Sequence, residues 1–160
     1  MVDGRDTPGR PAYELALLLL GAFERLTDGV HARLAQEGHP GVTSTHGFAM
    51  QAVGSGATTR DVAATLGVSK QAAAKTVERL IDMGYLEAHV DPRDARARIL
   101  THTDRGRDML RRSEHAFEVL RSTWAGLIGP DNLTALEDSL ALLNEHELGP
   151  SREGGVLGAG

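Results

Sequence analysis

Hydrophobic residues recur at steps of three and four along several stretches of the chain, which is the pattern of amphipathic helices. The first stretch spans residues 11–36, and its apolar stripe includes Leu15, Leu19, Leu26 and Leu34. Four further large apolar side chains make its first half apolar almost all round. A helix of this kind must be covered on several sides. In a small protein, this favours burial against a second subunit.

The same periodicity predicts five further helices, separated by breaks rich in glycine and proline. They are expected over residues 44–53, 59–66, 70–83 and 104–128, and from about Leu133 to near Gly149. After Gly84 the period changes, and apolar and polar residues alternate loosely over 85–90. A charged turn follows at 91–94, and residues 98–100 fit a second strand. This pattern predicts a β-hairpin. The expected fold is therefore mainly α-helical with one small β-hairpin.

Composition narrows the class of protein. The 160 residues contain no cysteine, so disulfides, thiolate metal sites and thiol redox switches are excluded. The longest apolar run has six residues, too short for a membrane span, and the polar start of the chain lacks a signal-peptide pattern. We expect one cytoplasmic domain with no membrane partner and no cofactor.

The net charge of −5 argues at first against a nucleic-acid binder, because duplex DNA attracts cationic surfaces. The charge is unevenly distributed, however. Residues 60–112 contain eleven Lys or Arg and eight Asp or Glu, and the rest of the chain contains six and fourteen. A basic centre between acidic ends suits a DNA reader on a separate scaffold, although chance clustering could produce the same imbalance.

Residues 59–80 contain the pattern of a helix-turn-helix, in which the second helix, the recognition helix, enters the major groove of DNA. The turn is Leu66-Gly67-Val68, and Ser69 is a good N-cap for the second helix. One face of that helix is apolar, formed by Ala73, Val77, Leu80 and Ile81. The opposite face is polar, formed by Lys70, Gln71, Lys75, Thr76 and Arg79. Small Ala72 lets the backbone approach a groove closely. The alternative is an ordinary surface helix with solvated charges.

The hairpin strengthens the DNA interpretation. Arg93, Arg96 and Arg98 lie within six residues around its turn. A wing that reaches into a narrow minor groove needs such arginines, because the potential there favours cations. Asp94 is expected to hold the Arg96 side chain by a charge-assisted bond. A merely solvated turn is the alternative.

Residues 68–80, 84–87 and 94–96, followed by Thr103 and Gly106, resemble the MarR (multiple antibiotic resistance regulator) family. The resemblance covers nearly the whole folded chain, and its most diagnostic part is the Asp-x-Arg of the wing, then a strand, Thr, two residues and Gly. It implies a dimer, palindromic operators, repression of a nearby gene and release by a small ligand. Two residues depart from the family pattern: His102 is expected to loosen packing of the wing on the core, and Ala88 removes a phosphate contact.

Composition predicts disordered tails at residues 1–10 and 149–160, which are rich in glycine or contain Gly, Pro and Asp. The resemblance implies that the chain between them, 11–148, is a single MarR-like domain. Within it, 11–37 and 103–148 would be dimerisation helices, and 44–102 the winged DNA-binding head. Combined with the pattern above, the expected DNA contacts are Ser69, Lys70, Gln71, Ala72, Lys75, Thr76, Arg79, Arg93, Asp94, Arg96 and Arg98.

A small-molecule effector would bind where the dimerisation helices meet the head. The bulky or polar-tipped candidates for this pocket are Tyr13, His46, Met50, Phe117 and Trp124. For any single one of them, a place in the hydrophobic core is the favoured explanation. The seven histidines are scattered, with no pair four apart on one helix, so we expect no metal site.

Two other classes of function remain as alternatives. An enzyme is disfavoured because the chain has no Gly-x-Ser-x-Gly, no phosphate-binding glycine loop and no HExxH motif. A winged helix that docks another protein without DNA is the second. In that case the polar face of the recognition helix and the wing arginines would be incidental.

Overall fold

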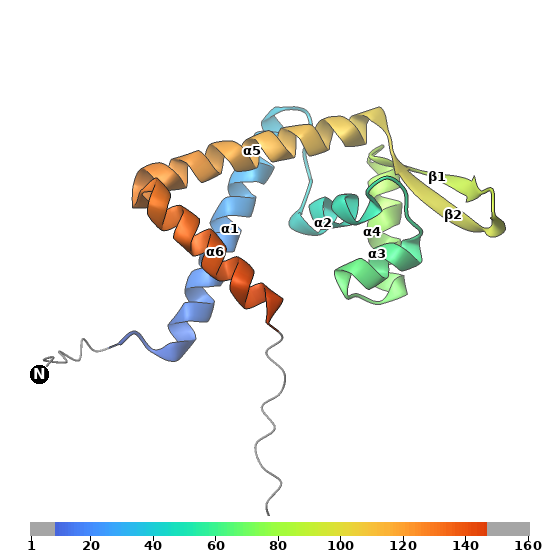
Figure 1. The fold of residues 1–160 in the computed structure, drawn as a ribbon. Helices are drawn as coiled ribbons and strands as arrows, with labels where there is room; N and C mark the ends of the chain where they lie inside the picture. Colours follow the sequence, from blue (N-terminus) through green and yellow to red (C-terminus); the bar gives the residue numbers. More distant parts are fainter. Residues whose placement is uncertain (1–8, 147–160) are drawn as a thin grey trace, which may run out of the picture. The chain divides into compact units, whose positions relative to one another are not determined.

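A computed structural model describes residues 9–146 (Figure 1). Their helices are α1 (Ala12–Gln36), α2 (Ser44–Val53), α3 (Thr59–Leu66), α4 (Lys70–Asp82), α5 (Asp104–Ile128) and α6 (Pro130–Glu145). The two strands, β1 (Leu86–Asp91) and β2 (Asp94–His102), form one antiparallel sheet. The expected fold class, mainly α with a small β-wing, is confirmed. The whole of the expected C-terminal tail and residues 1–8 of the expected N-terminal tail lie outside the described residues.

The chain divides into two compact parts, Met1–Leu120 and Arg121–Gly160, and α5 runs through the boundary between them. We describe each part by itself. The first contains α1 to α4, the hairpin and most of α5. The second contains the end of α5 and α6, where the Arg121 guanidinium makes a bidentate ion pair with Glu137.

Local signals explain where the helices of the helix-turn-helix begin and end. The Thr58 hydroxyl accepts from the Asp61 N–H at 3.2 Å, and the Asp61 carboxylate accepts from the Thr58 N–H at 2.8 Å, a complete capping box. Gly67, with φ 64°, ends α3 in the left-handed conformation. The Ser69 hydroxyl accepts from the Ala72 N–H and starts α4. The predicted turn and caps are therefore present.

The hairpin is longer than the sequence predicts. β2 spans nine residues, whereas the pattern indicated only 98–100. The two strands pair from Leu86 with His102 to Val90 with Arg98, with an irregular register before the turn. Most side chains toward the tip are exposed on both faces, including Val90. Because neither face is buried there, the part of β2 near the tip has no alternation of apolar and polar residues that would predict a strand.

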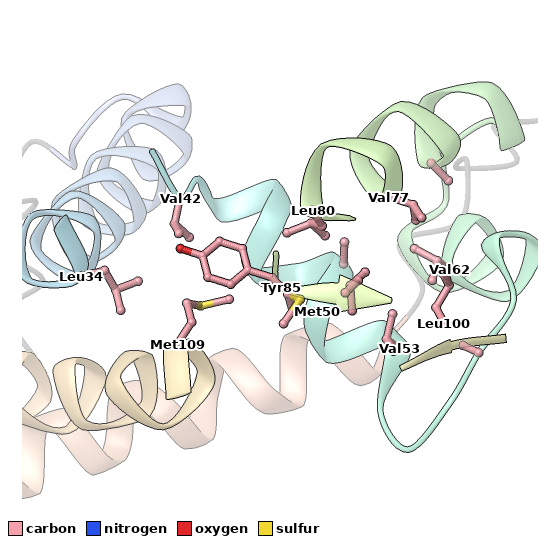
Figure 2. Packing of buried hydrophobic residues seen from close by; sticks show 14 of the residues in the cluster. Leu34, Val42, Met50, Val53, Val62, Val77, Leu80, Tyr85, Leu100 and Met109 are labelled. Carbon is pink, nitrogen blue, oxygen red and sulfur yellow. The ribbon is translucent and has the colours of Figure 1, made fainter. Parts of the chain in front are cut away.

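The buried core of the first part surrounds Tyr85, the residue before β1 (Figure 2). Met50 of α2, Leu80 of α4 and Leu100 of β2 pack in the same fully buried cluster. Leu34 of α1 and Met109 of α5 join it as well, so the core ties the head to the two long helices.

Two helix predictions need correction. Ile81, expected on the inward face of the recognition helix, is 38% exposed, because the face of α4 that packs inward repeats at Ala73, Val77 and Leu80. The last helix ends at Glu145 and not near Gly149. His146 already has an extended backbone, and the apolar repeat stops at Leu143.

One junction fixes the root of the wing against α5. Thr103 donates its hydroxyl to the Gly84 carbonyl at 2.6 Å and accepts the Gly106 N–H at 3.0 Å. Its own N–H donates to the Tyr85 carbonyl at 3.1 Å. A Cβ on Gly106 would lie 2.1 Å from that carbonyl oxygen. The Thr-x-x-Gly pattern therefore allows the start of α5 to pack closely against the backbone of Tyr85, the residue before β1.

Candidate nucleic-acid interface

The recognition helix α4 presents its polar face to solvent. Lys70, Gln71, Ala72, Lys75 and Arg79 are exposed, while Ala73, Val77 and Leu80 are buried on the opposite face. Among the described residues, the ammonium groups of the two lysines have no ion-pair partner. Their charges are therefore available to phosphates.

The first turn of α4 adds backbone donors to this surface. Ser69 is exposed and caps the helix, so its main chain lies at the positive end of the helix dipole. Thr76, further along, is partly buried and donates its hydroxyl to the Ala72 carbonyl at 3.2 Å. Thr76 is thus the least available of the expected contacts on this helix.

The wing carries the three expected arginines as exposed side chains. Arg93, Arg96 and Arg98 have no ion-pair partner among the described residues. The hairpin projects away from α3 and α4 within the first part, with its turn at the far end (Figure 1). Side chains so placed on an extended hairpin can reach a groove beside the one that a recognition helix occupies.

The aspartates of the wing have a different role from the expected one. The Asp94 carboxylate accepts the main-chain N–H of Arg96 at 2.9 Å and makes no bond to its guanidinium. Asp91 accepts the N–H of Arg93 at 2.8 Å in the same way. Both carboxylates close local turns. They shape the tip and leave the arginine side chains free to turn outward.

The root of the wing is attached more firmly than the sequence suggested. His102 was expected to loosen packing on the core. In the structure its Nε2 donates to the Met50 carbonyl of α2 at 2.9 Å. That bond gives a partner to a backbone oxygen near the end of α2 and anchors β2 to the head. Ala88 is exposed, on the strand opposite Leu100.

A buried histidine links the wing root to the long helices. His39, in the α1–α2 connection, is 3% exposed, and its Nε2 lies 3.0 Å from the Asp108 carboxylate of α5. Its Nδ1 lies 3.1 Å from the Tyr85 hydroxyl. Hydrogen bonds from Arg112 and then His39 lower the pKa of Asp108 to about 2. Arg112 also pairs with Glu37, next to the end of α1.

A cavity of about 90 Å³ lies among α1, α2 and α5 in the first part. Of the five expected effector contacts, only Phe117 lines it. Met50 is fully buried in the core, Tyr13 is 69% exposed near the start of α1, and Trp124 belongs to the second part. His46 lies on α2 outside the lining; its Nδ1 accepts the Thr43 N–H, and burial, followed by the charge of Arg79, lowers its pKa.

The sequence did contain a signal for this cavity. Its lining follows helical steps of three and four, with 27, 30, 31 and 34 on α1, 44, 47, 48 and 51 on α2, and 109, 110, 113 and 117 on α5; Val42 and Thr43 complete it. Such stripes also line cores, so the pattern alone does not show which of them surround a hollow.

The described residues contain neither a candidate metal site nor a candidate membrane span. No group of three or more His, Cys, Asp or Glu side chains there is arranged to hold a metal ion. None of the described helices is both long enough and apolar enough to cross a membrane.

Comparisons with known proteins match the head to a family model and the fold to solved structures. The MarR family model matches residues 48–97, which contain α3, α4 and most of the wing. A structure of MarR has a TM-score of 0.69 at 20% identity, covering 82% of this chain and 95% of that one. A mutant MarR from E. coli in complex with operator DNA has a TM-score of 0.68 at 16% identity, with coverages of 84% and 99%.

A further structure concerns regulation by a ligand. It describes how 6-hydroxynicotinic acid regulates DNA binding by BpsR of Bordetella bronchiseptica, and it has a TM-score of 0.66 at 18% identity, covering 88% of this chain and 99% of that one. A search among curated proteins finds no match.

Proposed function

We propose that this chain, whose residues 48–97 match the MarR family model, is a DNA-binding transcription regulator of that family, and that it acts as a homodimeric repressor of a palindromic operator, released by a small effector. Members of the MarR family are transcription regulators, which supports the expectation that the chain is not an enzyme. The cytoplasm, where such an operator is reached, stays the predicted location.

The observation that carries the proposal is the division of exposed cations between helix and wing. Lys70 and Lys75 lie on the exposed face of α4, beside Gln71. Gln pairs well with adenine edges and Lys with guanine, so this face supplies sequence readout. The wing arginines supply cations for a minor groove. Two recognition helices related by a dimer axis would enter major grooves about 34–36 Å apart.

The proposed dimer rests on apolar surface. Seven large apolar side chains of α1 between positions 13 and 23 are at least 40% exposed: Tyr13, Leu15, Leu17, Leu18, Leu19, Leu20 and Phe23. Within the second part, α6 likewise exposes Leu136, Leu142 and Leu143. Contiguous apolar patches of this kind mark protein interfaces. A second copy of the chain is the occupant that the family fold supports.

The proposed effector site is the cavity among α1, α2 and α5. The cavity is lined by the long helices α1 and α5 and by α2 of the head. A ligand there can therefore have different affinities for two conformations that differ in the position of the head. Only such a difference in affinity releases DNA. The regulation of BpsR by 6-hydroxynicotinic acid supports an effector in principle.

A comparison of three substitutions tests the DNA interface. Arg96→Ala should weaken binding to every duplex and reduce the salt dependence of that binding, because it removes a cation that would contact a phosphate or the minor groove. Gln71→Ala should change the sequence preference, since it removes a base contact. Arg33→Ala is the control, because it removes the same charge from the exposed last turn of α1. Fluorescence anisotropy with operator and point-mutated duplexes measures all three. Equal, sequence-independent losses from Arg96→Ala and Gln71→Ala would refute this division of roles.

Sedimentation equilibrium tests the dimer. Leu17→Glu places a charge in the exposed apolar stretch of α1 and should shift the protein from dimer toward monomer. Ala35→Glu adds the same charge to an exposed position in the last turn of the same helix and should not. A monomeric unmodified protein at micromolar concentration would refute the dimer directly.

A further inference from the structure

The cavity among α1, α2 and α5 is lined without any formal charge. Its walls are mostly apolar, and its polar side chains are those of Thr27, His31, Thr43, Ser44, Gln51 and Ser113. No Lys, Arg, Asp or Glu is among the lining residues. We infer that this cavity selects an uncharged planar ring compound and rejects the corresponding carboxylate. The inference rests on the proposed role of the cavity as the effector site.

The selection against an anion follows from solvation. A carboxylate that enters an apolar cavity loses its water and needs a cation or several donors in exchange. Among the lining side chains, only the imidazole of His31 can carry a positive charge. A neutral amide or hydroxyl of the same shape has no such requirement. The acid that regulates BpsR is therefore the wrong charge type for this cavity.

The preference for a flat ring follows from the aromatic lining. Phe48 of α2 and Phe117 of α5 both line the cavity, and they are 52% and 40% exposed. Phe48 stacks on Phe23 of α1, with ring centroids 6.4 Å apart and an interplanar angle of 13°. A planar ligand can cover the exposed parts of these rings and gains offset-stacking contacts in addition to burial. Sequence patterns alone missed Phe48 as a contact.

The polar groups that remain suit a neutral ligand with one or two hydrogen-bonding atoms. The Thr27 hydroxyl already donates to carbonyls of its own helix, at 3.0 and 3.1 Å, and is not available as a donor. Ser44, Gln51 and Ser113 have no side-chain hydrogen bond within the described residues. A hydroxyl or a carboxamide on the ring can pair with them.

Matched pairs of compounds test the inference. 6-Hydroxynicotinamide and 6-hydroxynicotinic acid have the same ring and nearly the same shape but differ in charge, as do benzamide and benzoate. Each is titrated at pH 8 into the complex of full-length protein and fluorescent operator, and release is followed by anisotropy. We expect each amide to act at a concentration at least about tenfold lower than its acid, a difference of about 1.4 kcal/mol.

A charge introduced into the lining should reverse the preference. Gln51→Lys adds a cation to an exposed position of the cavity and should make the acids the better ligands. Gln36→Lys adds the same charge at an exposed site outside the lining and should leave the order unchanged.

Three results would overturn the inference. The acids could act as well as the amides on the unmodified protein, which would show that a cation outside this lining faces the ligand. Gln51→Lys could leave the order of ligands unchanged. Or none of the four compounds could release the operator, which would show that the cavity is not an effector site for small neutral rings. Specific DNA binding is measured first without any compound, so its absence would count against the proposed function and not against the ligand class.

Discussion

Gly106→Ala probes the closest backbone crossing around the wing root. The added Cβ would lie 2.1 Å from the Tyr85 carbonyl oxygen, where about 3.0 Å is the practical minimum, and 3.0 Å from the Met50 methyl group. α5 or the wing root must therefore separate by nearly 1 Å. Overpacking of a tight core costs about 1–3 kcal/mol. The Tyr85 carbonyl also accepts the Thr103 N–H at 3.1 Å, and the loss of that bond adds about 1 kcal/mol. We expect a total loss of about 2–4 kcal/mol.

Urea unfolding followed by circular dichroism measures the effect, with Gly47→Ala as the matched control. Gly47 is also inside a helix, and a Cβ there meets nothing within 4 Å. The control should gain up to about 1 kcal/mol, because alanine favours helix more than glycine does. If Gly106→Ala were as stable as Gly47→Ala, the close crossing of α5 over Tyr85 would be wrong.

Two further predictions concern single interactions in the first part. The pKa of Asp108 is lowered to about 2 from 3.8, so its bonds to Arg112 stabilise the protein fully above about pH 4 and are lost as the pH falls toward 2. Urea midpoints from pH 2 to 7 should therefore show that Asp108→Asn is less stable at pH 7 and has a flatter acid limb; parallel curves would contradict this. Thr58→Ala removes the acceptor for the Asp61 N–H and should cost about 1 kcal/mol in urea unfolding. Thr59→Ala, one residue later, should cost clearly less, and equal losses would show that the capping box does not hold α3.

Local signals allowed much of the DNA-binding head to be predicted from sequence. The glycine at 67, the serine at 69 and the threonine at 58 each fix a helix end through a contact within three or four residues. Side chains on opposite faces of α4 follow directly from helical spacing. These features depend on neighbours in sequence, and therefore a single sequence contains them.

Long-range contacts could not be predicted in the same way. The bond from His102 to the Met50 carbonyl joins residues 52 positions apart, and nothing near His102 indicates its partner. The network of His39, Tyr85 and Asp108 brings together three distant segments. Met50 was taken for an effector contact because a large apolar residue on a helix fits a pocket and a core equally well. Only the packing of α2 against Tyr85 and its neighbours places it in the core.

A salt-dependent DNA titration tests the central claim most directly. Purified protein is titrated against the duplex upstream of its own coding region and against a random duplex of equal length, by fluorescence anisotropy at several salt concentrations. The account predicts tight binding to the first duplex, one dimer per site, and an affinity that falls steeply with salt. Weak and equal binding to both, followed by a genomic selection that recovers no bound fragment, would contradict it. That outcome would favour a winged helix that docks protein.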